Sequence, residues 1–209
     1  METVLISEKT IKPTKTDISN ELIYEIIDGQ PVYYAGYKDV LNKTKTIQDI
    51  MGSSGLQSTI IDLIVEYFHR IKFEGNLKYQ ILYSELGLHV ELKNNFAADI
   101  AIYNKADILD TDISDNYMSK PPRVIIEVDT KADVSNFNDV LEYIKIKTEK
   151  LLNFGTEKIL WVLTKSKKII VISESKKWYF ASWGEEIDII DNLKFTLQTL
   201  INENGTINE

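Results

Sequence analysis

Two acidic residues stand inside apolar runs that otherwise have the character of buried strands. Asp99 interrupts the run 97–102, and Glu127 interrupts the run 124–128. Because carboxylates are seldom buried unless they are paired or bind a cation, each acid needs a partner. If the two strands are neighbours, both side chains can leave one face of the sheet and meet, and such oxygen ligands suit Mg²⁺ or Mn²⁺. The alternative is that each acid lies in water at a strand end or pairs with a lysine.

Other charged residues near these two acids extend the candidate site. Asp129 follows Glu127 by two positions, and this spacing keeps both side chains on one face of a strand. A lysine is expected nearby, and Lys147 and Lys150 are three residues apart on an expected helix, so they share a face. The alternative for these lysines is an ordinary surface role, with glutamates of the same helix as partners.

The residue types that are missing or scarce narrow the chemistry. The 209-residue chain has no cysteine, which excludes thiol nucleophiles, thiolate metal sites and disulfides. Its two histidines, His69 and His89, are far apart in sequence, so a multi-histidine metal centre is not expected. With 24 basic and 32 acidic residues the net charge is −8, which disfavours general adhesion to nucleic acids or anionic membranes. Any nucleic-acid function would need a local basic face or a metal that bridges to phosphate.

Hydrophobic periodicity and turn residues predict a mixed α/β domain that carries these groups. The expected strands occupy residues 22–27, 32–34, 79–83, 88–92, 98–103, 124–128, 159–163, 169–172 and 178–180. The expected helices occupy residues 56–71, 137–153 and 194–202. Asp28-Gly29 predicts the turn of an N-terminal hairpin, and Gly155 predicts the end of the second helix. Residues 104–120 are acidic and without periodicity, and we expect them to leave the core as an excursion.

The same patterns predict how the chain is organised. We expect an arm at residues 1–20, one domain at 21–203 and a tail at 204–209. The longest apolar stretches are of strand length, shorter than the roughly 20 residues that a membrane span needs. The N-terminus lacks the apolar core of a signal peptide. A soluble, cytoplasmic protein without a membrane partner is therefore expected.

The order of these motifs resembles a known family. The motifs are Tyr24-Glu25-Ile26-Ile27-Asp28-Gly29, a helix, Asp99 on a strand, Ile126-Glu127-Val128 on the next, Lys147 eight residues before Gly155, and a strand containing Trp161. In this order they are similar to the Uma-type family, bacterial restriction-endonuclease-like proteins of the PD-(D/E)XK nuclease superfamily. The resemblance covers about residues 22–200. It implies a restriction-endonuclease-like core, which is a central mixed β-sheet flanked by helices with an N-terminal hairpin.

The resemblance also implies an activity. Asp99, Glu127 and the backbone carbonyl of Val128 match the residues that hold Mg²⁺ or Mn²⁺ in the superfamily. Lys147 matches the family's basic residue, and Asp129 stands where the superfamily often has a lysine. The implied function is metal-dependent hydrolysis of DNA phosphodiester bonds, with Asp99, Glu127, Lys147 and Asp129 as catalytic residues. DNA is then the implied partner, and a homodimer stays open.

Some positions are accessory or depart from the family pattern. Glu25 matches the glutamate of the Tyr-Glu-x-x-Asp-Gly signature without an assigned role, and Lys150 is a second candidate lysine. Gln57 stands where many members have histidine, and Ala98 replaces the usual proline before the aspartate. Gln57 and the acidic net charge favour an alternative, a catalytically inactive nuclease-fold protein that acts as an interaction or oligomerisation module. A metal-dependent hydrolase of another phosphoester is a further alternative.

Overall fold

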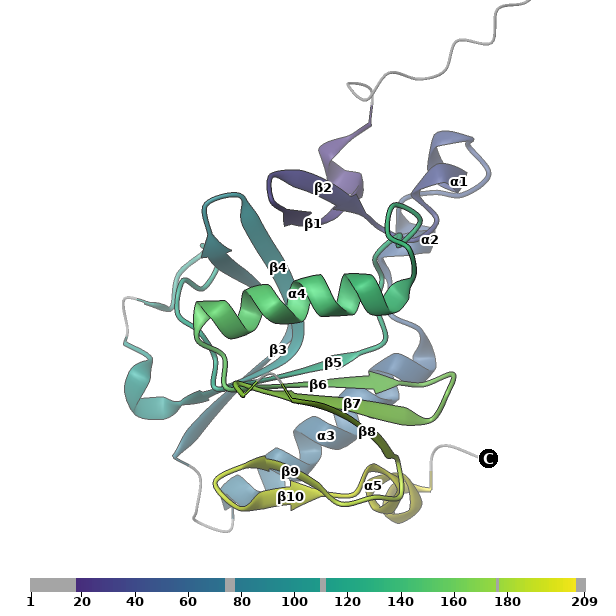
Figure 1. Ribbon diagram of the computed structural model, residues 1–209. Coiled ribbons are helices and arrows are strands. Elements are labelled where there is room, and N and C mark those ends of the chain that lie inside the picture. The colour runs from purple at the N-terminus through teal and green to yellow at the C-terminus, as the bar shows by residue number, and fades with distance from the viewer. Residues whose placement is uncertain (1–17, 74–77, 110–111, 176, 206–209) are drawn as a thin grey trace, which may run out of the picture.

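The computed structural model describes residues 18–73, 78–109, 112–175 and 177–205, and Figure 1 shows its arrangement. The strands are β1 (Ile23–Ile27), β2 (Gln30–Tyr33), β3 (Tyr79–Glu91), β4 (Asn94–Asn104), β5 (Val124–Val128), β6 (Lys158–Leu163), β7 (Lys168–Ser173), β8 (Trp178–Ser182), β9 (Ile187–Ile190) and β10 (Leu193–Phe195). The helices are α1 (Tyr37–Leu41), α2 (Gln48–Met51), α3 (Gly55–Phe73), α4 (Val140–Phe154) and α5 (Leu197–Asn204), with 3₁₀ turns at Asn20–Leu22 and Lys105–Asp107. Residues 1–17 of the expected arm and 206–209 of the expected tail lie outside the described residues.

A central mixed sheet organises the molecule. Its strand order is β2-β1-β4-β5-β6-β7-β8, and β3 pairs with β4 outside this path. The β5–β6 pair is parallel, whereas the other pairs in this sheet are antiparallel. The parallel pair requires a crossover connection, which α4 provides. The predicted fold class, a central mixed sheet flanked by helices, is confirmed.

Helices cover both faces of this sheet, and each face has its own apolar core. In Figure 1, α4 crosses in front of the sheet and α3 lies behind it. Val124, Ile126 and Val128 pack on the side of α3 and α5. Ile125 packs on the other side, against residues of α4. Because strand side chains alternate between faces, Glu127 belongs to the α4 side, where a buried carboxylate needs a polar partner.

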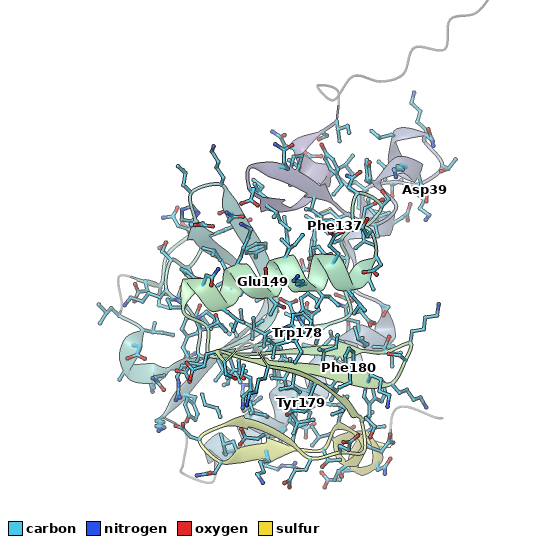
Figure 2. The ribbon with its side chains drawn as sticks, viewed as in Figure 1. Asp39, Phe137, Glu149, Trp178, Tyr179 and Phe180 are labelled. Carbon is cyan, nitrogen blue, oxygen red and sulfur yellow. The ribbon has the colours of Figure 1, made fainter. Side chains whose placement is uncertain are left out.

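Three expected elements differ from the observed ones. The expected strands 79–83 and 88–92 form one strand, β3, because both halves pair with β4 across an irregularity between Tyr83 and Leu86. Helix α4 begins at Val140 rather than 137, because the Asp139 side chain caps it by accepting from the Glu142 N–H at 2.9 Å. Phe137 therefore lies in the segment before the helix (Figure 2).

The C-terminal region also departs from expectation. The helix expected at 194–202 begins at Leu197, because Leu193–Phe195 pairs with β9 as β10. The short helices α1 and α2 were not predicted either. Along the described ranges, no helix combines the length and the apolar character needed to cross a membrane.

The predicted stop at Gly155 gives a stability test of the fold. Gly155 has φ 123°, and a Cβ placed there would lie 3.0 Å from Cγ of Pro121. We expect Gly155→Ala to lower the free energy of unfolding by about 1–3 kcal/mol, because both the backbone conformation and the contact are unfavourable. Urea unfolding measures this change. Gly184→Ala is the control, since a Cβ there meets no described atom within 4 Å; equal losses in both variants would contradict the explanation.

Candidate active site

The ammonium group of Lys147 is the centre of a buried polar cluster. Lys147 lies on α4 with a side chain only 1 % exposed. Its Nζ lies 2.7 Å from Oε1 of Glu25, 2.7 Å from the carbonyl oxygen of Ala97 and 3.0 Å from Oε1 of Glu127. Burial lowers the pKa of Lys147, but the carboxylates of Glu127 and Glu25 outweigh it and hold this pKa above its usual value. The lysine therefore remains a cation and joins α4 to β1, β4 and β5.

Glu25 is the main partner of this lysine. Besides Lys147, its carboxylate accepts hydrogen bonds from the Ala97 N–H at 3.1 Å and from the Tyr143 hydroxyl at 2.7 Å. Tyr143 lies one helical turn before Lys147, so both donors project from the same face of α4. Glu25 is 2 % exposed, and such burial of a carboxylate requires this number of partners. Glu25 thus fixes the position of the ammonium group.

Glu127 faces the same ammonium group but is less well satisfied. Its side chain is fully buried, and burial raises its pKa to about 8 against the opposing effect of Lys147. Within the described part of the chain, no group donates a well-aligned hydrogen bond to its Oε1, although Nζ of Lys147 is near enough for an ion pair. Oε1 of Glu127 therefore has an ion-pair partner in Lys147 but no hydrogen-bond donor among the described residues.

Asp99 lies on β4, the strand next to that of Glu127. The β4–β5 ladder ends at the pair of Ile100 with Ile126, so Asp99 and Glu127 each stand one residue beyond its last pair. Oδ2 of Asp99 accepts the Val128 N–H at 2.8 Å. Burial raises the pKa of Asp99, and this hydrogen bond opposes the rise. The two acids therefore lie at the same end of neighbouring strands.

Other predicted residues have different positions. Gln57 at the start of α3 is buried and donates from Nε2 to the Val128 carbonyl oxygen at 2.8 Å, so it lies beside the two acids. Asp129 has φ 56° and follows the end of β5, so strand alternation does not extend to it. Its carboxylate accepts from the N–H and the hydroxyl of Thr164, at 2.8 and 2.5 Å. Lys150 forms an ion pair with Asp28 at 2.6 Å rather than with the buried acids.

The site opens to solvent beside Asp99. A cavity of about 610 Å³ is lined by Asp99, by residues of α3 and by the middle of β3. His69, for which the sequence indicated no function, is among the α3 residues that line it. A second cavity of about 480 Å³ is lined by Glu25, Ala97 and residues of the N-terminal hairpin. The buried cluster therefore has an access route on each side.

Comparison with solved structures found a protein of similar fold. The structure is similar, with a TM-score of 0.61, to the crystal structure of "a putative nuclease belonging to DUF820" from Anabaena variabilis. The chain has a nuclease-like fold. The match covers 85 % of this chain and 89 % of the other at 11 % sequence identity, so it concerns the fold alone. No family model and no curated protein matches the sequence. The nuclease-like fold expected from the sequence is confirmed, and membership of the Uma-type family stays a prediction.

The acidic side chains of the site offer a limited set of ligands for a divalent metal ion. Among the described residues, no three histidine, aspartate or glutamate side chains surround a common cation position. One or two carboxylates are nevertheless a sufficient protein contribution for Mg²⁺, which commonly keeps waters and substrate phosphate as its other ligands. Oε1 of Glu127 has no hydrogen-bond donor among the described residues, and an ion bound there would share this atom with Nζ of Lys147 at 3.0 Å. Asp99 and Glu127 are the residues that would hold such an ion, whereas the Val128 carbonyl already has Gln57 as a partner.

Three further residues of the site were not predicted from sequence. Tyr143 could have been found by its spacing, because it lies four residues before Lys147 on one helix. Lys131 follows Glu127 by four residues, and its half-buried side chain forms an ion pair with Glu85. Glu85 had no signal in the sequence, because its direction depends on the irregularity in β3.

Proposed function

We propose that this protein is a divalent-metal-dependent nuclease that hydrolyses phosphodiester bonds in DNA. The observation that carries the proposal is the buried pair of Glu127 and Lys147, from β5 and α4, with the buried Asp99 on the adjacent strand β4 of a nuclease-like fold. The open cavity beside Asp99 supports it, because a polymeric substrate needs access from solvent. The acidic net charge is compatible with this function if bound metal and local lysines neutralise the phosphate.

Each residue has a distinct part in the proposed reaction. Asp99 and Glu127 would hold the metal, which would supply polarisation of a phosphoryl oxygen and a water ligand of lowered pKa. Lys147 stabilises the negative charge that develops on the phosphoryl group and orients the attacking water. Glu25 is a positioning residue, because it acts through Lys147. Gln57 orients the backbone at Val128, next to both acids.

The variant Asp99→Asn tests the proposal. We expect it to reduce cleavage of plasmid and single-stranded DNA in Mg²⁺ or Mn²⁺ by about 10²-fold or more, because the metal contributes several kcal/mol to the reaction. Titration calorimetry should show weaker metal binding in the same variant. Asp115→Asn, an exposed aspartate in the acidic excursion, is the matched control and should behave as wild type. Unchanged cleavage by Asp99→Asn would remove the proposal.

One observation favours a second candidate, the catalytically inactive interaction or oligomerisation module. The Gln57 amide occupies the Val128 carbonyl, a group that the family resemblance assigns to the metal. An inactive module has no need of a metal. Titration of the wild-type protein with Mn²⁺ distinguishes the two candidates. The absence of both binding heat and a shift in melting temperature would favour the inactive module over the nuclease.

A further inference from the structure

A strained bulge in β3 lies at the edge of the site. The β3–β4 register shifts between Tyr83 and Leu86, and the two residues between them, Ser84 and Glu85, have φ of 71° and 57°. The left-handed region costs non-glycine residues about 1–3 kcal/mol each, and such strain persists where the surrounding structure holds it, commonly at functional sites. The bulge directs Glu85 toward Lys131.

Lys131 is a second lysine near the acids, and it is half-buried. Its side chain is 10 % exposed. Its Nζ forms an ion pair with Glu85 and donates to the carbonyl oxygen of Met51 at 3.2 Å. Its charge, like that of Lys147, lowers the pKa of Asp99, so its ammonium group lies within electrostatic reach of the candidate metal ligand.

One partner of this ion pair, Glu85, lines both cavities, the one beside Asp99 and the one beside Glu25. The carboxylates of Asp62 and Glu66 add further negative charge to the first of these. A backbone phosphate next to the one that is cleaved needs a cation besides Lys147, whose ammonium group contacts three acceptors and is assigned to the reacting phosphoryl group. Lys131 is the cation paired with the residue that lines both cavities.

We infer that Lys131 binds a backbone phosphate of the nucleic-acid substrate and that the Glu85 carboxylate occupies this phosphate position in the free protein. The inference rests on the proposed nuclease function. The phosphate of the substrate then replaces the Glu85 carboxylate as the anionic partner of Lys131, so the half-buried ammonium group keeps a partner. It follows that removing the charge of Lys131 weakens binding, whereas removing the charge of Glu85 strengthens it.

The test measures binding of a fluorescein-labelled single-stranded DNA oligonucleotide to the full chain, in EDTA to prevent cleavage, across a salt series. We expect Lys131→Gln to weaken binding about 10-fold and to reduce the slope of log Kd against log salt by about 1. Glu85→Gln should tighten binding several-fold, because the phosphate no longer competes with a carboxylate. When Lys131 is already replaced by Gln, adding Glu85→Gln should change the Kd for DNA no more than adding Glu149→Gln does.

The controls carry the same charge changes outside the site. Lys145→Gln and Glu149→Gln alter exposed residues of α4, and Figure 2 labels Glu149 on the part of this helix nearest the viewer. Thermal unfolding verifies that each variant is folded. The inference is overturned if Lys131→Gln binds as Lys145→Gln does, or if Glu85→Gln weakens binding. In either case cleavage by the wild-type protein keeps the nuclease proposal, whereas a wild-type protein that neither binds nor cleaves DNA ends both.

Discussion

Glu127→Gln is expected to abolish cleavage while making the metal-free protein more stable. The carboxylate is a proposed metal ligand, and its loss should reduce activity by about 10³-fold, since an amide supplies no negative charge to the ion. The same substitution replaces a carboxylate by a neutral amide, and burial disfavours the charged form of that carboxylate. Lys147 keeps Glu25 and the Ala97 carbonyl, each at 2.7 Å, so no buried charge is left alone.

The pH dependence of stability explains why Glu127→Gln should stabilise the metal-free protein. Because the pKa of Glu127 is about 8 in the folded chain and close to 4.3 when unfolded, the unfolded state loses this proton first. The stability associated with this group is complete below about pH 4.3 and is lost as the pH rises toward 8. Glu127→Gln should remove this decline, with a gain on the order of 3 kcal/mol at pH 7.

Urea unfolding at pH 5 and pH 8, with and without Mn²⁺, measures these effects. Metal should stabilise the wild-type protein by mass action and leave Glu127→Gln unchanged. Glu149→Gln, on the exposed face of α4, is the control for the loss of one negative charge. A variant that cleaves DNA at the wild-type rate would exclude Glu127 as a ligand. A loss of several kcal/mol would show that its carboxylate is needed for folding.

Lys147→Met should have the largest effect on stability. The substitution keeps much of the side-chain volume but removes the cation that faces Glu25 and Glu127 in a buried site. Removing one partner of a buried ion pair typically costs about 3–5 kcal/mol, because the remaining charge is unpaired. The pKa of Glu127 rises further without this ammonium group, so the loss should be greater at pH 8 than at pH 5.

Lys150→Met is the matched control, on the same helix and with the same change of side chain. Lys150 pairs with Asp28, whose side chain is 69 % exposed, and such pairs contribute about 1 kcal/mol or less. Adding Glu25→Gln to Lys147→Met should recover part of the lost stability, because the buried carboxylate is then neutral. Equal losses for Lys147→Met and Lys150→Met in guanidinium unfolding would contradict the buried network.

Local signals in the sequence were sufficient for most elements. The Asp28-Gly29 turn, the stop at Gly155 and the apolar runs of β5 and β6 act over a few residues, so a single segment contains the information. Strands whose extent depends on pairing with another strand were harder to predict from the sequence. The continuous β3 follows from its pairing with β4, and β10 follows from its pairing with β9.

For the site, the sequence by itself singled out Asp99 and Glu127 as acids within apolar runs, which need partners if the runs are buried. Only the tertiary structure decided what those partners are. Lys147 reaches Glu25 across 122 positions of sequence, and Asp129 turns to Thr164 instead of the cluster. The physical reason is that burial follows from local composition, whereas a contact between distant side chains depends on strand register, helix packing and backbone conformation.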